Sequence, residues 1–207
     1  MGLFALRSAL LTLAVGIQLA GCVRIKDVQA PALAPRYVRP APGARSAEPL
    51  VLVYDPRELP DVVLLAVPDG FPPGKLLGAR SLVTEHLRGG LESLFERVDV
   101  VDDPGKVAAG ALVGTVRFVE IGIAMAPGGK TAVGTLEWSL TLHRGDQPQP
   151  LYSWGERTVG TREGAGSFGS FDPTPEIQGA IEASLRALLK DMDAKGVVAS
   201  AAPPTTP

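Results

Sequence analysis

The segment from Thr131 to His143 alternates between two classes of side chain, and this alternation constrains the fold more than any other feature of the chain. Successive side chains of a β-strand point to opposite faces of a sheet, so we expect a strand with one packed and one solvated face. Such a strand needs a covering layer. The apolar or small parity comprises Ala132, Gly134, Leu136, Trp138, Leu140 and Leu142, and the polar parity comprises Thr131, Thr135, Glu137, Ser139, Thr141 and His143.

Two amphipathic helices are predicted to provide that cover. From about Ala79 to Val98, apolar residues recur at three- and four-residue spacing. The pair Gly89-Gly90 inside this segment marks either a weak point or a place where the helix backbone approaches a sheet. The second helix is expected to start at Thr174, a residue type that caps helices, with Pro175 at the first helical position. It is expected to end at Gly196.

Three further regions favour strands. Residues 50–54 and 62–67 are short β-branched runs separated by Asp55-Pro56 and Leu59-Pro60, which predict one or two strands and leave their pairing open. In residues 112–125 the apolar parity switches, which indicates either a β-bulge near Val119-Glu120 or a strand covered on both faces. Another strand is expected to run from Tyr152 toward Thr161.

The order of these elements is β(β)αβββα, which predicts an α+β fold. We predict an antiparallel sheet of about four to five strands with two helices on one face, because this arrangement buries the apolar faces of both helices against one sheet. A length of 207 residues suits a single domain of ordinary size with tails. The 20 Lys and Arg residues nearly balance the 22 Asp and Glu residues, which argues against a nucleic-acid partner.

The first segment of the chain has the features of an export signal. Arg7 precedes an apolar run from Ser8 to Ala20, which is shorter than the roughly 20 residues of a membrane-spanning helix. The run ends in Leu19-Ala20-Gly21-Cys22, which contains the only cysteine in the chain. An unpaired cysteine in an exported protein needs an explanation of its own, because it has no partner for a disulfide.

The motif Leu19-Ala20-Gly21-Cys22 resembles the lipobox of bacterial lipoproteins. This resemblance implies cleavage between Gly21 and Cys22, a diacylglycerol on the Cys22 sulfur and an acylated amine at the new N-terminus. Two or more acyl chains hold a protein stably on a membrane. Residue 23 is Val, where many proteobacterial lipoproteins kept in the inner membrane have Asp, so the resemblance implies the periplasmic face of the outer membrane.

The sequence therefore divides into a signal peptide (1–21), a lipidated and Pro-rich tether (22–49), a single α+β domain (50–196) and a disordered tail (197–207). Five prolines between residues 29 and 49 favour extended polyproline geometry in the tether. The tether is also basic, which either attracts anionic headgroups or simply solvates the linker. The tail is rich in Ala, Pro and Thr.

Two glycine-rich motifs suggest nucleotide binding or hydrolysis, but the residues that follow them do not fit either function. The segment AMAPGGKT (124–131) resembles a loosened phosphate-binding loop, but a strand pattern follows it where a helix is required. The segment GAGSFG (164–169) matches a dinucleotide-binding pattern and nearly forms a nucleophile elbow around Ser167. No histidine follows that serine. We interpret this segment as a candidate partner-contact loop, comprising Gly164, Gly166, Ser167, Phe168 and Gly169.

The histidines and aromatic residues favour structural roles. His86 and His143 are far apart in the sequence and are expected at the surface or at a boundary, so no metal site is predicted. Trp138, Tyr152 and Trp154 are expected to fill the core. With no nucleophile and base nominated, we expect no enzymatic activity and no cofactor other than the covalent lipid on Cys22.

At the level of element order, the chain resembles two kinds of small outer-membrane lipoprotein, the lipopolysaccharide-assembly lipoprotein and the YajG-type periplasmic lipoproteins. The resemblance implies a non-enzymatic accessory or scaffold subunit in envelope assembly or transport, with an envelope protein as its partner. The alternative is a module that binds lipid or another apolar ligand between the sheet and the helices. A deep pocket lined by Leu136, Trp138 and Trp154 would support that alternative, and a solid core there would count against it.

Overall fold

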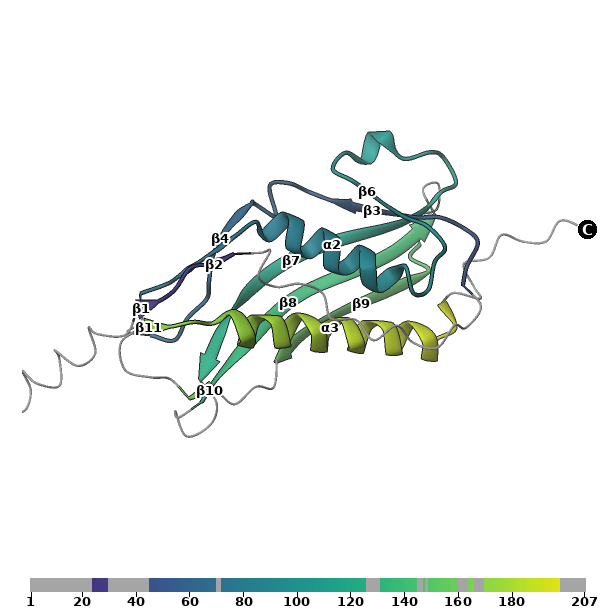
Figure 1. The fold of residues 1–207 in the computed structure, drawn as a ribbon. Helices are drawn as coiled ribbons and strands as arrows, with labels where there is room; N and C mark the ends of the chain where they lie inside the picture. The colour runs from purple at the N-terminus through teal and green to yellow at the C-terminus, as the bar shows by residue number, and fades with distance from the viewer. Residues whose placement is uncertain are drawn as a thin grey trace, which may run out of the picture.

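The computed structural model describes residues 24–29, 45–69, 72–125, 131–144, 147, 149–159, 164–165 and 170–197. Figure 1 shows an elongated α+β domain, with both helices on the same side of a twisted sheet. The helices are α2 (Ala79–Leu91) and α3 (Thr174–Ala194), and η2 (Pro104–Lys106) is a short 3-10 turn. The strands are β1 (Arg24–Ile25), β2 (Val28–Gln29), β3 (Leu50–Tyr54), β4 (Val62–Leu64), β5 (Lys75–Leu77), β6 (Val98–Val101), β7 (Leu112–Met125), β8 (Thr131–Arg144), β9 (Tyr152–Val159), β10 (Gly164–Ala165) and β11 (Ser170–Phe171).

The main sheet has six strands and confirms the predicted α+β class. Strands β7, β8 and β9 form an antiparallel meander, and β10 pairs with the beginning of β8. The prediction of an antiparallel sheet is right for this part. Strand β3, however, runs parallel to both of its neighbours, β6 and β7. The connection from β3 to β6 includes α2, and a helical crossover of this kind returns the chain in the parallel direction.

The predicted bulge in β7 is confirmed. The pairing with β8 shifts between Phe118 and Glu120, so Val119 is the extra residue and is 57% exposed. The shift moves the packed face from the parity of Phe118 to that of Ile121. An inserted residue has this effect because the side-chain period of a strand is two.

Helix α2 ends earlier than predicted. The sequence pattern extends the helix to Val98, but the helix stops at Leu91 and Val98 begins the edge strand β6. The Ser93 hydroxyl donates a hydrogen bond to the Gly90 carbonyl at 2.6 Å, which satisfies an acceptor of the last turn. Gly90 faces the other helix: a Cβ atom there would lie 3.4 Å from Leu185.

Helix α3 lies within one or two residues of its predicted limits, but Pro173 and not Thr174 is at the N-cap, so Thr174 is the first helical residue. The helix packs closely on the sheet. Asp172 accepts hydrogen bonds from the main-chain N–H and the hydroxyl of Thr174 at 3.0 and 2.6 Å. A Cβ atom at Gly134 of β8 would overlap the Glu176 main-chain carbonyl, so the close approach of helix and strand requires glycine. No helix within the described ranges is long and apolar enough to cross a bilayer.

A small sheet in the order β2-β5-β4 lies at one end of the molecule. Residues 62–67 therefore do not join the sheet of β3 along their length, and β4 pairs antiparallel with β5 instead. Ala66 connects the two sheets: its N–H donates to Ile121 and its carbonyl accepts from Ile123, at 3.0 and 2.7 Å. A Cβ atom at Gly122 would overlap that Ala66 carbonyl, so the junction also requires glycine.

The folded domain starts and ends outside the predicted limits of 50–196. Strand β1 pairs with β11 and β2 pairs with β5, both in parallel, so residues 24–29 belong to the domain and not to the tether. At the other end, Val197 is buried. Two-residue strands carry no periodicity, which is why the sequence pattern did not separate them from the linker.

Candidate functional site

The residues selected for lipidation and partner contact lie mostly outside the described part of the chain. Gly21, Cys22, Gly166, Ser167, Phe168 and Gly169 fall there, and so do the predicted tail beyond Val197 and the Pro-rich residues 30–44. Gly164 is described: it begins β10 and pairs with Ala132 of β8.

The two histidines occupy different environments. The His143 ring lies on the solvated face of β8, 3.3 Å from the Thr115 hydroxyl. His86 is only 3% exposed, so its expected surface position is wrong. It lies on the face of α2 that packs on the sheet, in the same layer as Leu82 and Leu87. Among the described residues, no group of three or more His, Cys, Asp and Glu side chains is arranged to hold a metal ion.

The aromatic residues fill the core as expected. Trp138 and Trp154 are buried, with ring centroids 4.8 Å apart, and the Trp138 indole N–H donates to the Ser184 hydroxyl of α3. The Tyr152 hydroxyl donates to Asp191 at 2.7 Å, and burial raises the pKa of this tyrosine. The cavity beside Trp138 and Leu136 measures about 20 Å³. That is room for about one water molecule, so an acyl chain does not fit at this point of the core.

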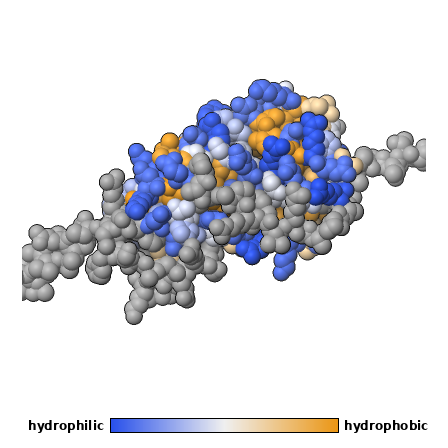
Figure 2. Space-filling model, viewed as in Figure 1, coloured by the Kyte–Doolittle hydropathy of each residue, from blue (hydrophilic) through white to orange (hydrophobic). Residues whose placement is uncertain are grey.

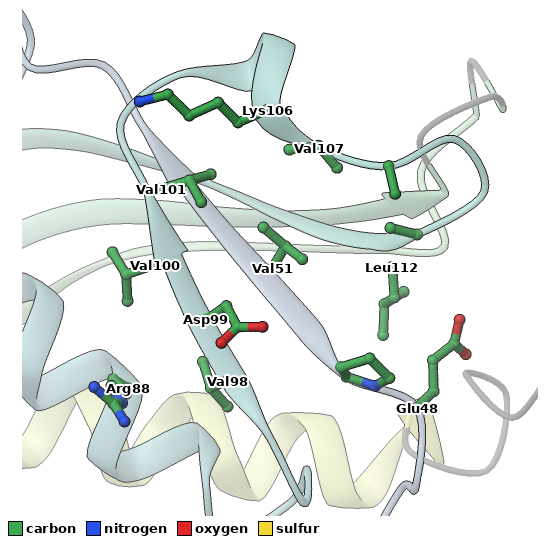
Figure 3. Close-up of a pocket in the computed structure, with 13 residues that line it drawn as sticks. Glu48, Val51, Arg88, Val98, Asp99, Val100, Val101, Lys106, Val107 and Leu112 are labelled. Carbon is green, nitrogen blue, oxygen red and sulfur yellow. The ribbon is translucent and has the colours of Figure 1, made fainter.

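The described residues also form a much larger open groove, of about 690 Å³, at the end of the molecule opposite the small sheet. Figure 3 shows Val51 on β3, Asp99 on β6 and Val107 on the η2 loop around the same space. Figure 2 shows apolar surface beside that loop. The apolar lining comprises Pro49, Val51, Val98, Val100, Val101, Val107, Ala108, Ala111 and Leu112, and the charged lining comprises Glu48, Arg88, Asp99 and Lys106.

The charged residues around the groove are engaged in ion pairs. Lys106 donates to Asp102 at 3.1 Å, and this bond lowers the pKa of that carboxyl. Asp99 lies 2.9 Å from the Arg97 guanidinium, and Arg88 lies 2.8 Å from Glu92. These pairs are solvent-exposed, so the groove combines an apolar floor with charged residues that are paired within the chain.

The Glu48–Arg144 pair shapes one wall of the groove. The Arg144 guanidinium donates to both carboxylate oxygens of Glu48, at 2.6 and 3.1 Å. Both side chains are largely buried, with exposures of 18% and 13%. Arg144 also donates to the Gly110 carbonyl at 3.5 Å. One side chain of β8 therefore holds the segment before β3 and the loop before β7 in place.

Strand β6 lies at one edge of the main sheet among the described residues, and all four of its residues line the groove. Figure 3 shows it between Arg88 of α2 and Val51 of β3. An edge strand presents main-chain N–H and C=O groups that an added strand can use. The groove thus combines an edge strand with apolar pockets, an arrangement suited to an extended peptide.

Sequence reasoning missed this groove. Its lining comes from Glu48 to Val51, from α2, from β6 and from residues 106–112, and only the parallel pairing of β3 with β6 and β7 brings these segments together. A local signal was available: the run Val98-Asp99-Val100-Val101 followed by Asp102-Asp103-Pro104-Gly105 is typical of a strand and a turn.

No protein-family model and no curated protein sequence matches the chain. Among solved structures, the chain is similar to a Xanthomonas campestris protein of the DUF330 family model, with a TM-score of 0.55 and 12% identity over 86% of this chain and 98% of that one. It also matches a structure described as a neuraminyllactose-binding hemagglutinin homolog from Helicobacter pylori, with a TM-score of 0.43 and 11% identity, covering 79% and 92% of the two chains. The first likeness shows a shared fold and nothing about function.

Proposed function

We propose that the protein is a lipid-anchored envelope protein, held on the periplasmic face of the outer membrane through Cys22, and that it acts as a non-enzymatic accessory or scaffold subunit in envelope assembly or transport. The proposed localisation rests on the Leu19-Ala20-Gly21-Cys22 motif and on Val23 after the cysteine. The accessory role rests on one observation in the fold, the groove along the edge of β6.

The groove supports a protein partner for three physical reasons. It exposes a strand edge, its apolar residues are recessed, and its charges are paired within the chain. A partner segment that adds to β6 gains main-chain hydrogen bonds, and its alternate side chains can enter the apolar lining.

A second candidate function is the binding of a small apolar ligand in the same groove. Its volume of about 690 Å³ lies within the range of ligand sites, and most of its lining is apolar. The space beside Trp138 does not favour this function, because it is too small.

Photo-crosslinking in intact cells tests the accessory role. A crosslinking amino acid at Val101, in the groove, is expected to give a discrete adduct with one envelope protein. The matched control is Arg186, which is exposed on α3 and is expected to give no such adduct. Equal adducts at both positions, or none at Val101, would contradict the proposal. Lipid co-purifying without any protein adduct would instead favour the ligand-binding alternative.

The anchor is tested separately by fractionation. Replacing Cys22 by Ala is expected to move the protein from the membrane pellet to the soluble fraction, because acyl chains provide the stable attachment. Continued sedimentation of Cys22→Ala with membranes would contradict the lipid anchor and leave the groove experiment unaffected.

A further inference from the structure

The first described strands are integral parts of the domain. Ile25 and Val28 are 4% and 0% exposed, and the Lys75 N–H donates to the Asp27 carboxylate at 2.9 Å. The chain around Gly74 lies so close that an added Cβ atom would come within 2.7 Å of the Lys26 carbonyl. Residues 24–29 are thus fixed to β5 and β11 on both sides of the short connection between β1 and β2.

This arrangement limits how far the domain can lie from Cys22. Only Val23 separates the cysteine from the start of β1, and an extended chain advances at most about 3.6 Å per residue, so a lipid on Cys22 would be joined to the domain by about 7 Å of chain or less. The Pro-rich segment comes after β2. It connects β2 to Ser46, which is bridged to Phe95, and therefore does not set the distance between the domain and the cysteine.

The small sheet at this end of the molecule has an outer face that exposes large apolar residues. Val62 and Leu64 of β4 are 49% and 62% exposed, whereas Leu76 of β5 is buried on the other face. Leu64 pairs with Lys75, and Val62 pairs with Leu77. Directly opposite residues of an antiparallel pair share a face. We define the outer face as Val62, Leu64, Lys75 and Leu77.

Apolar side chains beside an exposed lysine match the chemistry of a membrane interface. Leucine and valine side chains can enter the boundary between headgroups and acyl chains, while a lysine ammonium reaches the phosphates. Lys26, next to β1, is also exposed. Figure 1 places β1, β2 and β4 at the same end of the domain, and Figure 2 shows apolar surface there.

From these observations we propose that the outer face of the small sheet rests on the phospholipid bilayer, so that the anchored domain has a fixed orientation with the groove pointing away from the membrane. This inference rests on the proposed lipid anchor at Cys22. The lipid anchor explains why this surface would meet a bilayer: in every anchored molecule, the membrane is only a few residues away from β1. The predicted long tether, in contrast, would leave the domain free to tumble.

Depth-dependent quenching tests this orientation on the full-length lipidated protein in vesicles of phosphatidylethanolamine and phosphatidylglycerol. Leu64→Cys places a thiol-reactive NBD fluorophore on the outer face. Leu151→Cys is the matched control, because Leu151 is also an exposed leucine (43%) but lies at the groove end. The thioether at Cys22 does not react with the dye, so each variant carries one label.

We expect NBD at position 64 to be quenched at least threefold more strongly by doxyl-labelled lipids than NBD at position 151, with emission shifted to the blue. If the protein floats with the vesicles and the two labels are quenched equally, the anchor stands and the proposed orientation is wrong. If the protein does not float and Cys22 is unmodified, the lipid anchor is wrong and the orientation falls with it.

Discussion

The two ends of the domain expose apolar residues in opposite ways. At the small-sheet end, Val62 and Leu64 are exposed on β4, and Leu64 pairs with Lys75 of β5. At the groove end, the apolar residues are recessed along β6, and the charges around them are paired. An exposed apolar face that includes a lysine suits a lipid surface, whereas a strand edge beside an apolar groove suits a peptide. This difference agrees with the proposals made above, a membrane contact at the small-sheet end and a partner segment in the groove.

The largest expected effect comes from the junction between the small sheet and the main sheet. Gly122→Ala places a Cβ atom against the Ala66 carbonyl, which accepts a hydrogen bond from Ile123. We expect a loss of about 2–3 kcal/mol in the free energy of unfolding, because the backbone must shift. Urea denaturation of a Cys22→Ala form checks this value.

The matched control for that variant is Gly179→Ala. A Cβ atom at this position of α3 meets no atom within 4 Å, so the substitution is expected to stabilise the protein by roughly 0.5–1 kcal/mol through helix propensity. Equal effects of the two alanines would show that the junction at Gly122 is not tightly packed, and the small sheet would then be free to move relative to the groove.

The second effect concerns the groove end. Glu48→Gln removes the negative charge from the largely buried pair with Arg144. We expect a loss of about 2 kcal/mol in the free energy of unfolding, because the Arg144 guanidinium then stays buried without an opposite charge beside it. The same variant should weaken crosslinking from Val101, since the wall of the groove loosens.

Glu58→Gln provides the control for that charge change. Glu58 lies 3.9 Å from Arg117 in an exposed pair, and exposed pairs contribute between zero and about 1 kcal/mol. If Glu48→Gln changes the urea midpoint no more than Glu58→Gln does, the Glu48–Arg144 pair does not shape the groove.

The smallest expected effect is a pH dependence at the start of α3, next to the small sheet. Hydrogen bonds from Thr174 hold the pKa of Asp172 below its ordinary value of 3.8. A carboxyl with a lowered folded pKa contributes stability above its ordinary pKa, and this contribution is lost as the pH falls through the folded value. We therefore expect the thermal midpoint to decrease as the pH is lowered below about 4. The decrease should be smaller in Asp172→Asn. An unchanged slope in that variant would exclude Asp172 as a source of the acid sensitivity.

Local signals in the sequence predicted local structure. The alternation in residues 131–143 located β8, the parity switch located the bulge at Val119, and Thr174 and Gly196 marked the ends of α3. Each of these signals depends on neighbours within a few residues. The Trp138 and Trp154 side chains also fill the core as expected, Trp138 from the packed parity of β8.

The features that define the two ends could not be predicted in the same way, because they depend on pairing between distant segments. Strand β2 is two residues long and is fixed by β5, where Val28 pairs with Leu76, 48 positions later in the chain. The groove depends on β6. Its first residue, Val98, fits the apolar spacing of the preceding helix, so the sequence pattern assigns it to that helix. His86 is buried because of how α2 is rotated over the sheet, and the sequence does not fix that rotation.

The most direct test of this account is the mass of the N-terminal peptide of the protein isolated from its native membrane. The account predicts a peptide that begins at Cys22 and carries a diacylglycerol on sulfur and an acyl group on the amine. A peptide that retains residues before Cys22, or a Cys22 with an unmodified thiol, would contradict the account, because nothing would then hold the small-sheet end against the bilayer.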